Sequence, residues 1–202
     1  MKVRLAAASD LSTILQWREE AAAWLHKRGS DQWSDAGLTR YAFVRRVTES
    51  IQAGNTWIVD DDDGTPLGTI AVDSTSDPGL WSPEELERAY VIHRMITDRS
   101  AAGRGVGKLM LDHAESLARR DGRRVLILDA WTSNADLHAY YESRASGMSE
   151  LCSVITHPAR HSLNVRWRRT WGTVTTSDDE NPFTRAWVPG WVGWAEGSTS
   201  FP

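Results

Sequence analysis

Three glycines at alternate positions, Gly103, Gly105 and Gly107, constrain the fold of this chain more than any other feature. The run 89–97 before them is typical of a central strand, and apolar residues recur at helical spacing from about 106 to 120. Because glycine has no Cβ, successive backbone amides of such a turn can point into one concavity. The helix that begins there adds free N–H groups and partial positive charge. The sequence therefore predicts a strand, a turn and a helix that together form an anion site suited to phosphate.

Two common phosphate-binding motifs do not fit this turn. A Walker motif needs a glycine five residues before Gly107 and a Ser or Thr after Lys108, where the chain has Ala102 and Leu109. The dinucleotide motif Gly-x-Gly-x-x-Gly also fails, because its third glycine would fall on Lys108 or Met110. A turn with a purely structural role stays open at this point.

The rest of the chain alternates between strand-like and helix-like segments. We expect strands at 3–5, 56–59, 67–72, 125–128, 151–156 and 162–168. We expect helices at 11–29, 38–51 and 134–144 and a short one at 82–85. This order predicts an α/β (α+β) fold, in which a mixed central sheet of about six to seven strands carries helices on both faces.

Local signals set the ends and faces of the first two helices. Ser9 or Asp10 supplies an N-cap oxygen for the first helix. The apolar pattern of the second helix predicts a buried face made of Tyr41, Val44, Val47, Thr48 and Ile51.

Four successive aspartates, Asp60–Asp63, separate the strands expected at 56–59 and 67–72. They lack the alternating ligand spacing and the distal glutamate of a calcium loop. A solvated hairpin turn is therefore the favoured interpretation.

The glycine-rich turn resembles the pyrophosphate-binding loop of the GNAT N-acetyltransferases, Arg/Gln-x-x-Gly-x-Gly/Ala, which joins their fourth strand to the next helix. Gly105 and Gly107 match, and Ala102 stands where a basic or amide residue is usual. The element order also agrees, so the resemblance implies a GNAT-type acetyltransferase domain over 1–170 that uses acetyl-CoA and no metal. It further implies that fourth and fifth strands splay apart. The cofactor would lie on Met95, Ile96, Thr97, Gly103, Arg104, Gly105, Val106, Gly107, Lys108 and Asn134.

The helix expected at 134–144 carries two candidate residues on one face. Asn134 and Tyr141 are seven residues, or two turns, apart, whereas Tyr140 points about 100° away. The resemblance implies that Asn134 contacts an arm of the cofactor and that Tyr141 protonates the departing thiolate. A phenol suits this task because it can donate a hydrogen bond without being ionised. The alternative is that both tyrosines are packing residues.

The resemblance implies direct attack of an amine on the thioester, without a covalent enzyme intermediate. A backbone amide near Met95 would polarise the carbonyl oxygen. His93 and Asp129 are the candidate bases that take a proton from the substrate ammonium. Alternatively, His93 is a hydrogen-bonded core residue and Asp129 a cap or a partner for a cation.

Aromatic and acidic residues form a candidate acceptor site. They could surround a cationic amine, although packing roles are an equal alternative: Trp24, Asp31, Gln32, Trp33 and Trp131. Either a small-molecule amine or a peptide amino group fits this prediction.

Composition limits the partners. The 202 residues carry a net charge of −4, which gives no electrostatic reason to bind nucleic acid. No run approaches the ~20 apolar residues of a membrane span, and the start lacks a signal peptide, so we expect a cytoplasmic protein without membrane contact. Residues 171–202 form a tryptophan-rich extension of unknown role. The alternatives for it are packing on the sheet, contact with another chain, as in a homodimer, and a disordered tail. A non-catalytic acyl-CoA-binding module and a structural oligomer are the alternative functions.

Overall fold

The computed structural model describes residues 1–30, 32–33, 39–76, 81–131, 134–143, 154–156 and 163–170. By its internal contacts the chain divides into two units, Met1–Trp171 and Gly172–Pro202. The second unit, with most of the tryptophan-rich extension, lies outside the described residues, and so does Asp31. Within these ranges there is no helix with the length and apolar character that a bilayer crossing requires.

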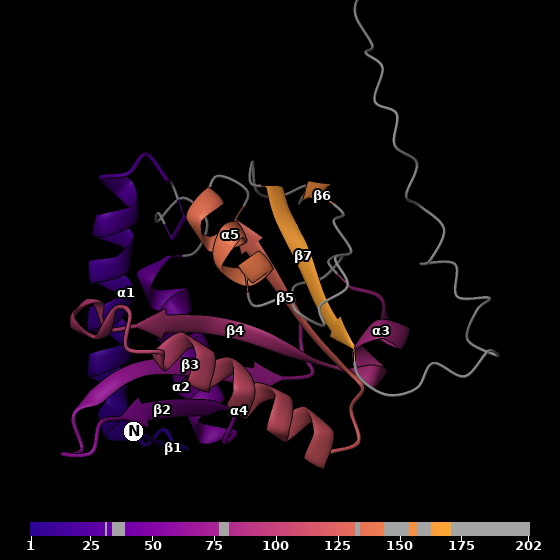
Figure 1. The fold of residues 1–202 in the computed structure, drawn as a ribbon, viewed down its shortest axis with the longest axis horizontal. Coiled ribbons are helices and arrows are strands. Elements are labelled where there is room, and N and C mark those ends of the chain that lie inside the picture. The colour runs from indigo at the N-terminus through magenta and orange to yellow at the C-terminus, as the bar shows by residue number, and fades with distance from the viewer. Residues whose placement is uncertain are drawn as a thin grey trace, which may run out of the picture. The chain divides into compact units, whose positions relative to one another are not determined.

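Seven strands form one mixed sheet in the order β1-β2-β3-β4-β5-β7-β6 (Figure 1). The β4–β5 pair is parallel, and the other pairs of this described sheet are antiparallel. The strands are β1 Lys2–Leu5, β2 Thr56–Asp60, β3 Pro66–Asp73, β4 Ala89–Thr97, β5 Val125–Trp131, β6 Val154–Thr156 and β7 Leu163–Thr170.

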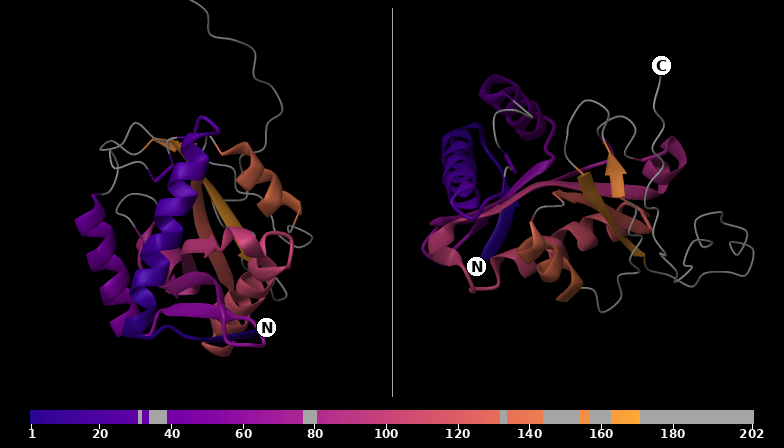
Figure 2. Two further views of the ribbon diagram at one scale, coloured as in Figure 1. Left: turned by 90° about the vertical axis from the view of Figure 1, so that its left-hand side faces the viewer. Right: turned by 90° about the horizontal axis from the view of Figure 1, so that it is seen from above.

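Helices cover both faces of this sheet. Figure 2 shows α1 and α2 on one face and α4 and α5 on the other. The helices are η1 Ala8–Asp10, α1 Leu11–His26, α2 Arg40–Gln52, α3 Pro83–Arg88, η2 Arg99–Ala101, α4 Val106–Arg120 and α5 Ala135–Ser143. The predicted α/β fold, with a mixed sheet between two helical layers, is confirmed.

Two apolar clusters lie on the two faces of the sheet. On the α4 side, Met110 and Val106 of that helix pack with Ile70 and Val72 of β3 and with further buried residues. The cluster on the α1 and α2 side consists of Ile14, Trp17, Phe43, Val47, Ile58 and Ile96. Because β2 and β4 contribute to both clusters, the centre of the sheet is buried on both faces.

The predicted buried face of α2 was wrong in part. Tyr41 is 79% exposed, whereas Phe43, Val47 and Ser50 are buried. Ser50 can lie on the buried face because its hydroxyl shares a 2.8 Å hydrogen bond with the hydroxyl of Thr56 on β2. The predicted face included Val47 but left out both Phe43 and Ser50, so it was rotated away from the true contact face.

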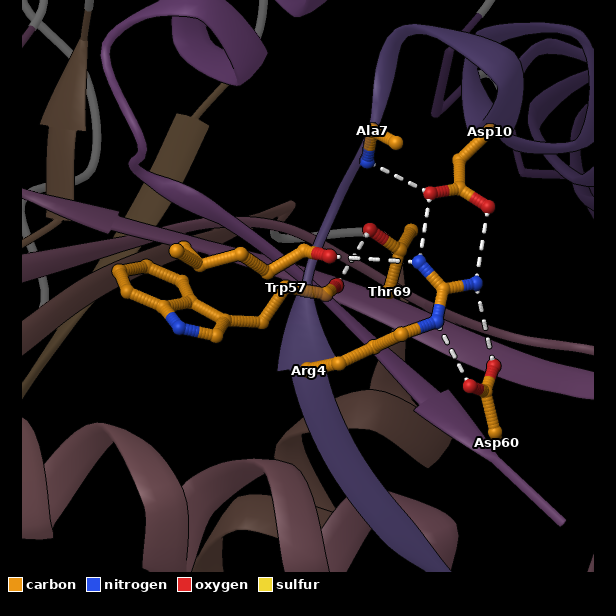
Figure 3. Close-up of polar contacts among 7 residues, drawn as sticks. Arg4, Ala7, Asp10, Trp57, Asp60 and Thr69 are labelled. Carbon is orange, nitrogen blue, oxygen red and sulfur yellow. Dashed lines mark hydrogen bonds and ion pairs between the residues drawn. The ribbon is translucent and has the colours of Figure 1, made fainter. Parts of the chain in front are cut away.

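Asp10 has a different role from the predicted side-chain cap. It stands at the N-cap of α1 without a side-chain cap bond, and its carboxylate accepts from the Ala7 amide and from Arg4 (Figure 3). The Arg4 guanidinium also donates to Asp60 of β2 at 2.6 Å. The hydrogen bond from Arg4 lowers the pKa of the Asp10 carboxyl. Two nearly buried carboxylates thus hold β1, β2 and η1 together through one arginine.

The aspartate run forms the turn between β2 and β3, and each carboxylate has a partner. Asp60 binds Arg4, Asp61 binds Arg104, Asp62 binds the N-terminal ammonium, and Asp63 accepts from the Thr65 amide. In the described part of the chain, no group of three or more His, Cys, Asp or Glu side chains is placed to hold a metal ion.

Candidate functional site

The strands β4 and β5 are paired over their first halves only. Their pairing runs from Ala89–Val125 to Ile92–Leu128, after which β4 remains on β3 and β5 continues along β7. The two ribbons diverge beyond this point in Figure 1. The second half of β4 therefore has one backbone edge that takes no strand partner in the described sheet.

A bulge in β4 lies next to this divergence. Thr69 of β3 is opposite Ile96, and Ala71 is opposite His93, so one residue of β3 faces two residues of β4. One of the two, Arg94, has a φ of 47°, in the left-handed region that favours glycine. Bulges increase twist and redirect side chains, and they are common beside active sites.

The three glycines of the turn have two different roles. Gly103 and Gly105 have φ values of 78° and 82°, which other residues adopt only with strain. Gly107 instead lies in the first turn of α4, where an added Cβ would clash with the Tyr140 hydroxyl of α5. The amides of a first helical turn have no acceptor within the helix, so those of Val106, Gly107 and Lys108 are suited to bind an anion.

Both predicted cations of the turn are engaged with neighbouring carboxylates. Arg104 lies 2.7 Å from Asp61 of the β2–β3 turn, and Lys108 pairs with Asp112 one helical turn later. All four side chains are at least partly exposed to solvent. Such pairs contribute little to stability, so a phosphate can replace the carboxylates at small cost.

The two adjacent tyrosines of α5 occupy different environments. Tyr141 is 5% exposed and belongs to the core cluster on the α4 side. The Tyr140 ring lies edge-on to it at 5.5 Å, and its hydroxyl reaches Gly107. The tyrosine that approaches the glycine turn is therefore Tyr140, whereas the predicted acid, Tyr141, packs in the core beside it.

Asn134 joins the start of α5 to the segment after α1. Its Oδ1 accepts from the Leu137 amide at 3.1 Å and so caps the helix, and its Nδ2 donates to Gln32 at 2.6 Å. A 3.0 Å ion pair between Arg28 and Asp136 connects the same two regions. The predicted cofactor-binding Asn134 thus also determines where Gln32 lies.

His93 lies in a polar cluster with the end of β3. Its Nε2 is 2.9 Å from the Thr75 carbonyl oxygen and 3.3 Å from a carboxylate oxygen of Asp73. Because a carbonyl only accepts, Nε2 carries the proton and Nδ1 is the basic nitrogen. Burial opposes ionisation of Asp73, but hydrogen bonds from His93 and Thr75 outweigh it and lower the pKa of this carboxyl to about 2.

Sequence reasoning missed Arg94, which follows His93 on the bulge. Its side chain is half-buried, and burial lowers the pKa of the guanidinium, with Asp73 opposing this effect and Arg46 adding to it. No hydrogen bond or ion pair joins it to another residue in the part of the chain that the structure describes. The available signal was a charged residue in the middle of an otherwise apolar central strand.

Trp24, one of the predicted acceptor residues, is already in contact with cations of this chain. Two guanidinium groups, those of Arg28 and Arg99, already lie over the Trp24 ring, 4.3 and 4.0 Å from its centroid. Asp31 and the side chains of Asp129 and Trp131 lie outside what the structure describes.

Trp33 lies beside a pocket on α1. It has a φ of 63°, and its carbonyl accepts from Arg18 at 3.0 Å. The pocket is lined by Arg18, Glu19, Ala22, His26, Ser30, Gln32 and Trp33. It brings two of the predicted acceptor residues, Gln32 and Trp33, to the α1 side of the sheet.

Comparison with known proteins agrees with this geometry. The model of the acetyltransferase (GNAT) family matches residues 14–148. An uncharacterised N-acetyltransferase of Bacillus subtilis (strain 168), YesJ, is 28% identical over 138 residues, which cover 67% of this chain and 76% of that protein. A GNAT-family acetyltransferase structure from Listeria monocytogenes 4b F2365 has a TM-score of 0.66 at 24% identity and covers 84% of this chain and 94% of its own.

A further similar structure was solved with a ligand. The PaiA N-acetyltransferase of Thermoplasma acidophilum, in complex with coenzyme A, has a TM-score of 0.59 at 14% identity, over 84% of this chain and 98% of its own. At such identities the structures show a shared fold, whereas the family model covers most of this chain. The chain therefore belongs to the GNAT acetyltransferase family, whose enzymes use an acyl-CoA as acyl donor.

Proposed function

We propose that this protein transfers the acetyl group of acetyl-CoA to a primary amine by direct attack, without a covalent enzyme intermediate. One observation carries the proposal: a turn with two left-handed glycines begins α4 beside the half of β4 that is not paired with β5. The turn offers amides for a diphosphate, and the strand edge offers amides and carbonyls for an extended arm.

The residues present fit acetyl-CoA. Gly103, Gly105 and the first-turn amides of Val106, Gly107 and Lys108 would hold the diphosphate, with Arg104 adding charge. An added Cβ at Gly103 or Gly105 would meet no atom within 4 Å, so the approach to these two residues is open. The β4 edge formed by Met95, Ile96 and Thr97 would pair with the pantetheine arm, and Asn134 would contact it from α5. When bound, acetyl-CoA supplies an acyl carbon activated by its thioester.

The protons must be moved by side chains of this protein. The attacking nitrogen forms the new C–N bond and loses a proton, and the departing sulfur gains one. His93 is the first candidate base, because its Nε2 is engaged by Thr75 and Asp73 and its Nδ1 is the nitrogen that can accept a proton. Asp129 is the second candidate base. Tyr141 is proposed as the acid that protonates the thiolate, with Tyr140 as its neighbour at the glycine turn.

The test compares two glycines that both have a left-handed φ. Gly105 and Gly122 begin and follow α4, their φ values are 82° and 70°, and an added Cβ meets nothing within 4 Å at either. Gly105→Asp should weaken acetyl-CoA binding in a calorimeter about 100-fold, because it places like charge against the diphosphate. Gly122→Asp should bind as the wild type does.

Turnover is measured with the same variants and a panel of amines. Acetylated amine, detected by mass spectrometry, should appear with the wild type and Gly122→Asp and be lost with Gly105→Asp. Equal binding by both variants would contradict the proposed cofactor site. Tight binding without acetylation of any amine would instead support a non-catalytic acyl-CoA-binding module.

A further inference from the structure

We propose that the acceptor is an amine with an anionic group a few bonds away, as in a free amino acid, and that Arg94 binds this group. The inference rests on the proposed acetyl transfer and adds the substrate class. It is carried by a cation on the β4 bulge that no described residue neutralises by direct contact.

The side of the sheet on which Arg94 lies follows from its neighbours on β3 and β4. Neighbouring residues of a strand point to opposite faces. Val72 belongs to the cluster on the α4 side, so Asp73 points to the side of α1 and α2. His93 contacts Asp73, and the charges that act on Arg94 come from Asp73 and from Arg46 of α2. The bulge after His93 interrupts the alternation, so Arg94 lies on the same side as His93, facing α1 and α2 and opposite the glycine turn on the α4 side.

Among the described residues, no carboxylate is in direct contact with the Arg94 guanidinium. Of the charges that act on Arg94, that of Asp73 is negative and that of Arg46 is positive. The Asp73 carboxylate is already engaged by His93 and Thr75. A half-buried guanidinium is costly unless an anion accompanies it. An anionic substrate group would supply the missing charge, and a planar carboxylate matches the guanidinium in shape.

The backbone of Arg94 has an unusual conformation. A non-glycine residue with a φ of 47° carries strain that the surrounding structure must offset. The bulge places this strained arginine directly after His93, the proposed base. In an α-amino acid the amine and the carboxylate are attached to the same carbon, so one of two adjacent residues can bind the carboxylate while the other takes a proton from the amine.

The experiment first uses the wild-type protein with matched acceptors. Each amino acid is compared with its primary amide and with the amine that lacks the carboxylate, at saturating acetyl-CoA. We expect kcat/KM to be about 10- to 100-fold higher for the amino acid, the range of a hydrogen bond to a charged group. Equal values for the three acceptors would overturn the inference while leaving acetyl transfer intact.

Variants then test whether Arg94 causes the preference for the amino acid over its uncharged analogues. Arg94→Gln should bring kcat/KM for the amino acid close to the value for its amide, and Arg94→Lys should restore part of the difference. Arg45→Gln, in a surface pair on α2, is the matched control and should keep the preference. A uniform loss on all acceptors in a folded Arg94→Gln protein would overturn the assignment. If this variant does not fold, Arg94→Lys and the wild-type acceptor series decide.

Failure of the proposed function has a separate signature. It would appear as no acetylation of any amine, charged or uncharged, and would remove this inference as well. A peptide acceptor is distinguished by peptides that begin with the same residues: acetylation of these at the rate of the free amino acid would contradict recognition of the carboxylate.

Discussion

At the β4 bulge, one side of the sheet presents backbone amides and the other side presents charged and polar side chains. On the α4 side, the glycine turn presents backbone amides, and its residues are close together in the sequence. On the α1 and α2 side, His93, Arg94, Asp73 and Arg46 present side chains from β4, β3 and α2. A backbone site depends on local conformation and tolerates many side chains, whereas the second site depends on each side chain. The glycine turn, the proposed acyl-donor side, can therefore be shared widely in a family. The group around His93 and Arg94, the proposed acceptor side, can be specific.

The largest expected effect tests the proposed acid. Tyr141→Phe should lower kcat about 100-fold with unchanged acetyl-CoA affinity, because only proton donation to the thiolate is lost. Tyr140→Phe, the neighbouring control, should change kcat by no more than about threefold. Steady-state kinetics and calorimetry check both variants. The opposite ranking would move the acid to the tyrosine at the glycine turn.

A second prediction tests whether the donor side is purely local. In most helices Gly→Ala is stabilising, by up to about 1 kcal/mol. Gly107→Ala should instead destabilise the protein by about 2 kcal/mol, because the new methyl meets the Tyr140 hydroxyl. Urea unfolding of both single variants and of Gly107→Ala/Tyr140→Phe forms a double-mutant cycle. Full additivity would show that α5 does not restrict this position.

A third prediction concerns pH and the acceptor side. The pKa of Asp73 is about 2 in the folded protein, below the usual 3.8, so the unfolded state binds more protons between these values. The stability that Asp73 contributes is thus complete above about pH 4 and is lost as the pH falls toward 2. The wild type should lose about 1 to 2 kcal/mol more than Asp73→Asn between pH 5 and pH 2.5. His93→Gln should reduce this difference, and identical acid transitions in all three proteins would refute the coupling.

The smallest expected effect concerns side chains at the turn. Asp61→Asn releases Arg104, and Asp112→Asn releases Lys108. Each change should tighten acetyl-CoA binding about two- to fivefold at low salt and less at high salt, because one carboxylate no longer competes with phosphate. Calorimetry at two salt concentrations checks this. Weaker binding by Asp61→Asn would mean that the carboxylate positions Arg104 for the ligand.

The sequence predicted the strand and the helix on either side of the glycine turn well. The expected strand 89–97 and helix 106–120 match β4 and α4. Glycines, helical periodicity and an apolar strand are local signals, and they act within one turn or one strand of the chain. The role of Gly107 was not foreseen, because its neighbour Tyr140 comes from another helix.

The sequence predicted less about α2 and the acceptor side. Tyr41 was expected in the core and is exposed, because Ser50 faces the sheet with a hydrogen bond to Thr56. The Arg94 bulge arises from the register between β3 and β4 and has no signature within β4 itself. The Trp24 ring, expected at the acceptor site, lies under Arg28, four residues later, and under the distant Arg99.

By itself, the sequence determined the α/β fold and the strand–turn–helix unit, because glycine conformation and hydrophobic periodicity act between near neighbours. Only the tertiary structure decided which tyrosine reaches the glycine turn, where the β4 bulge lies and that none of the described residues places an anion in contact with Arg94. These features depend on the register of paired strands and on which helix packs against which, and such contacts join residues that are distant along the chain.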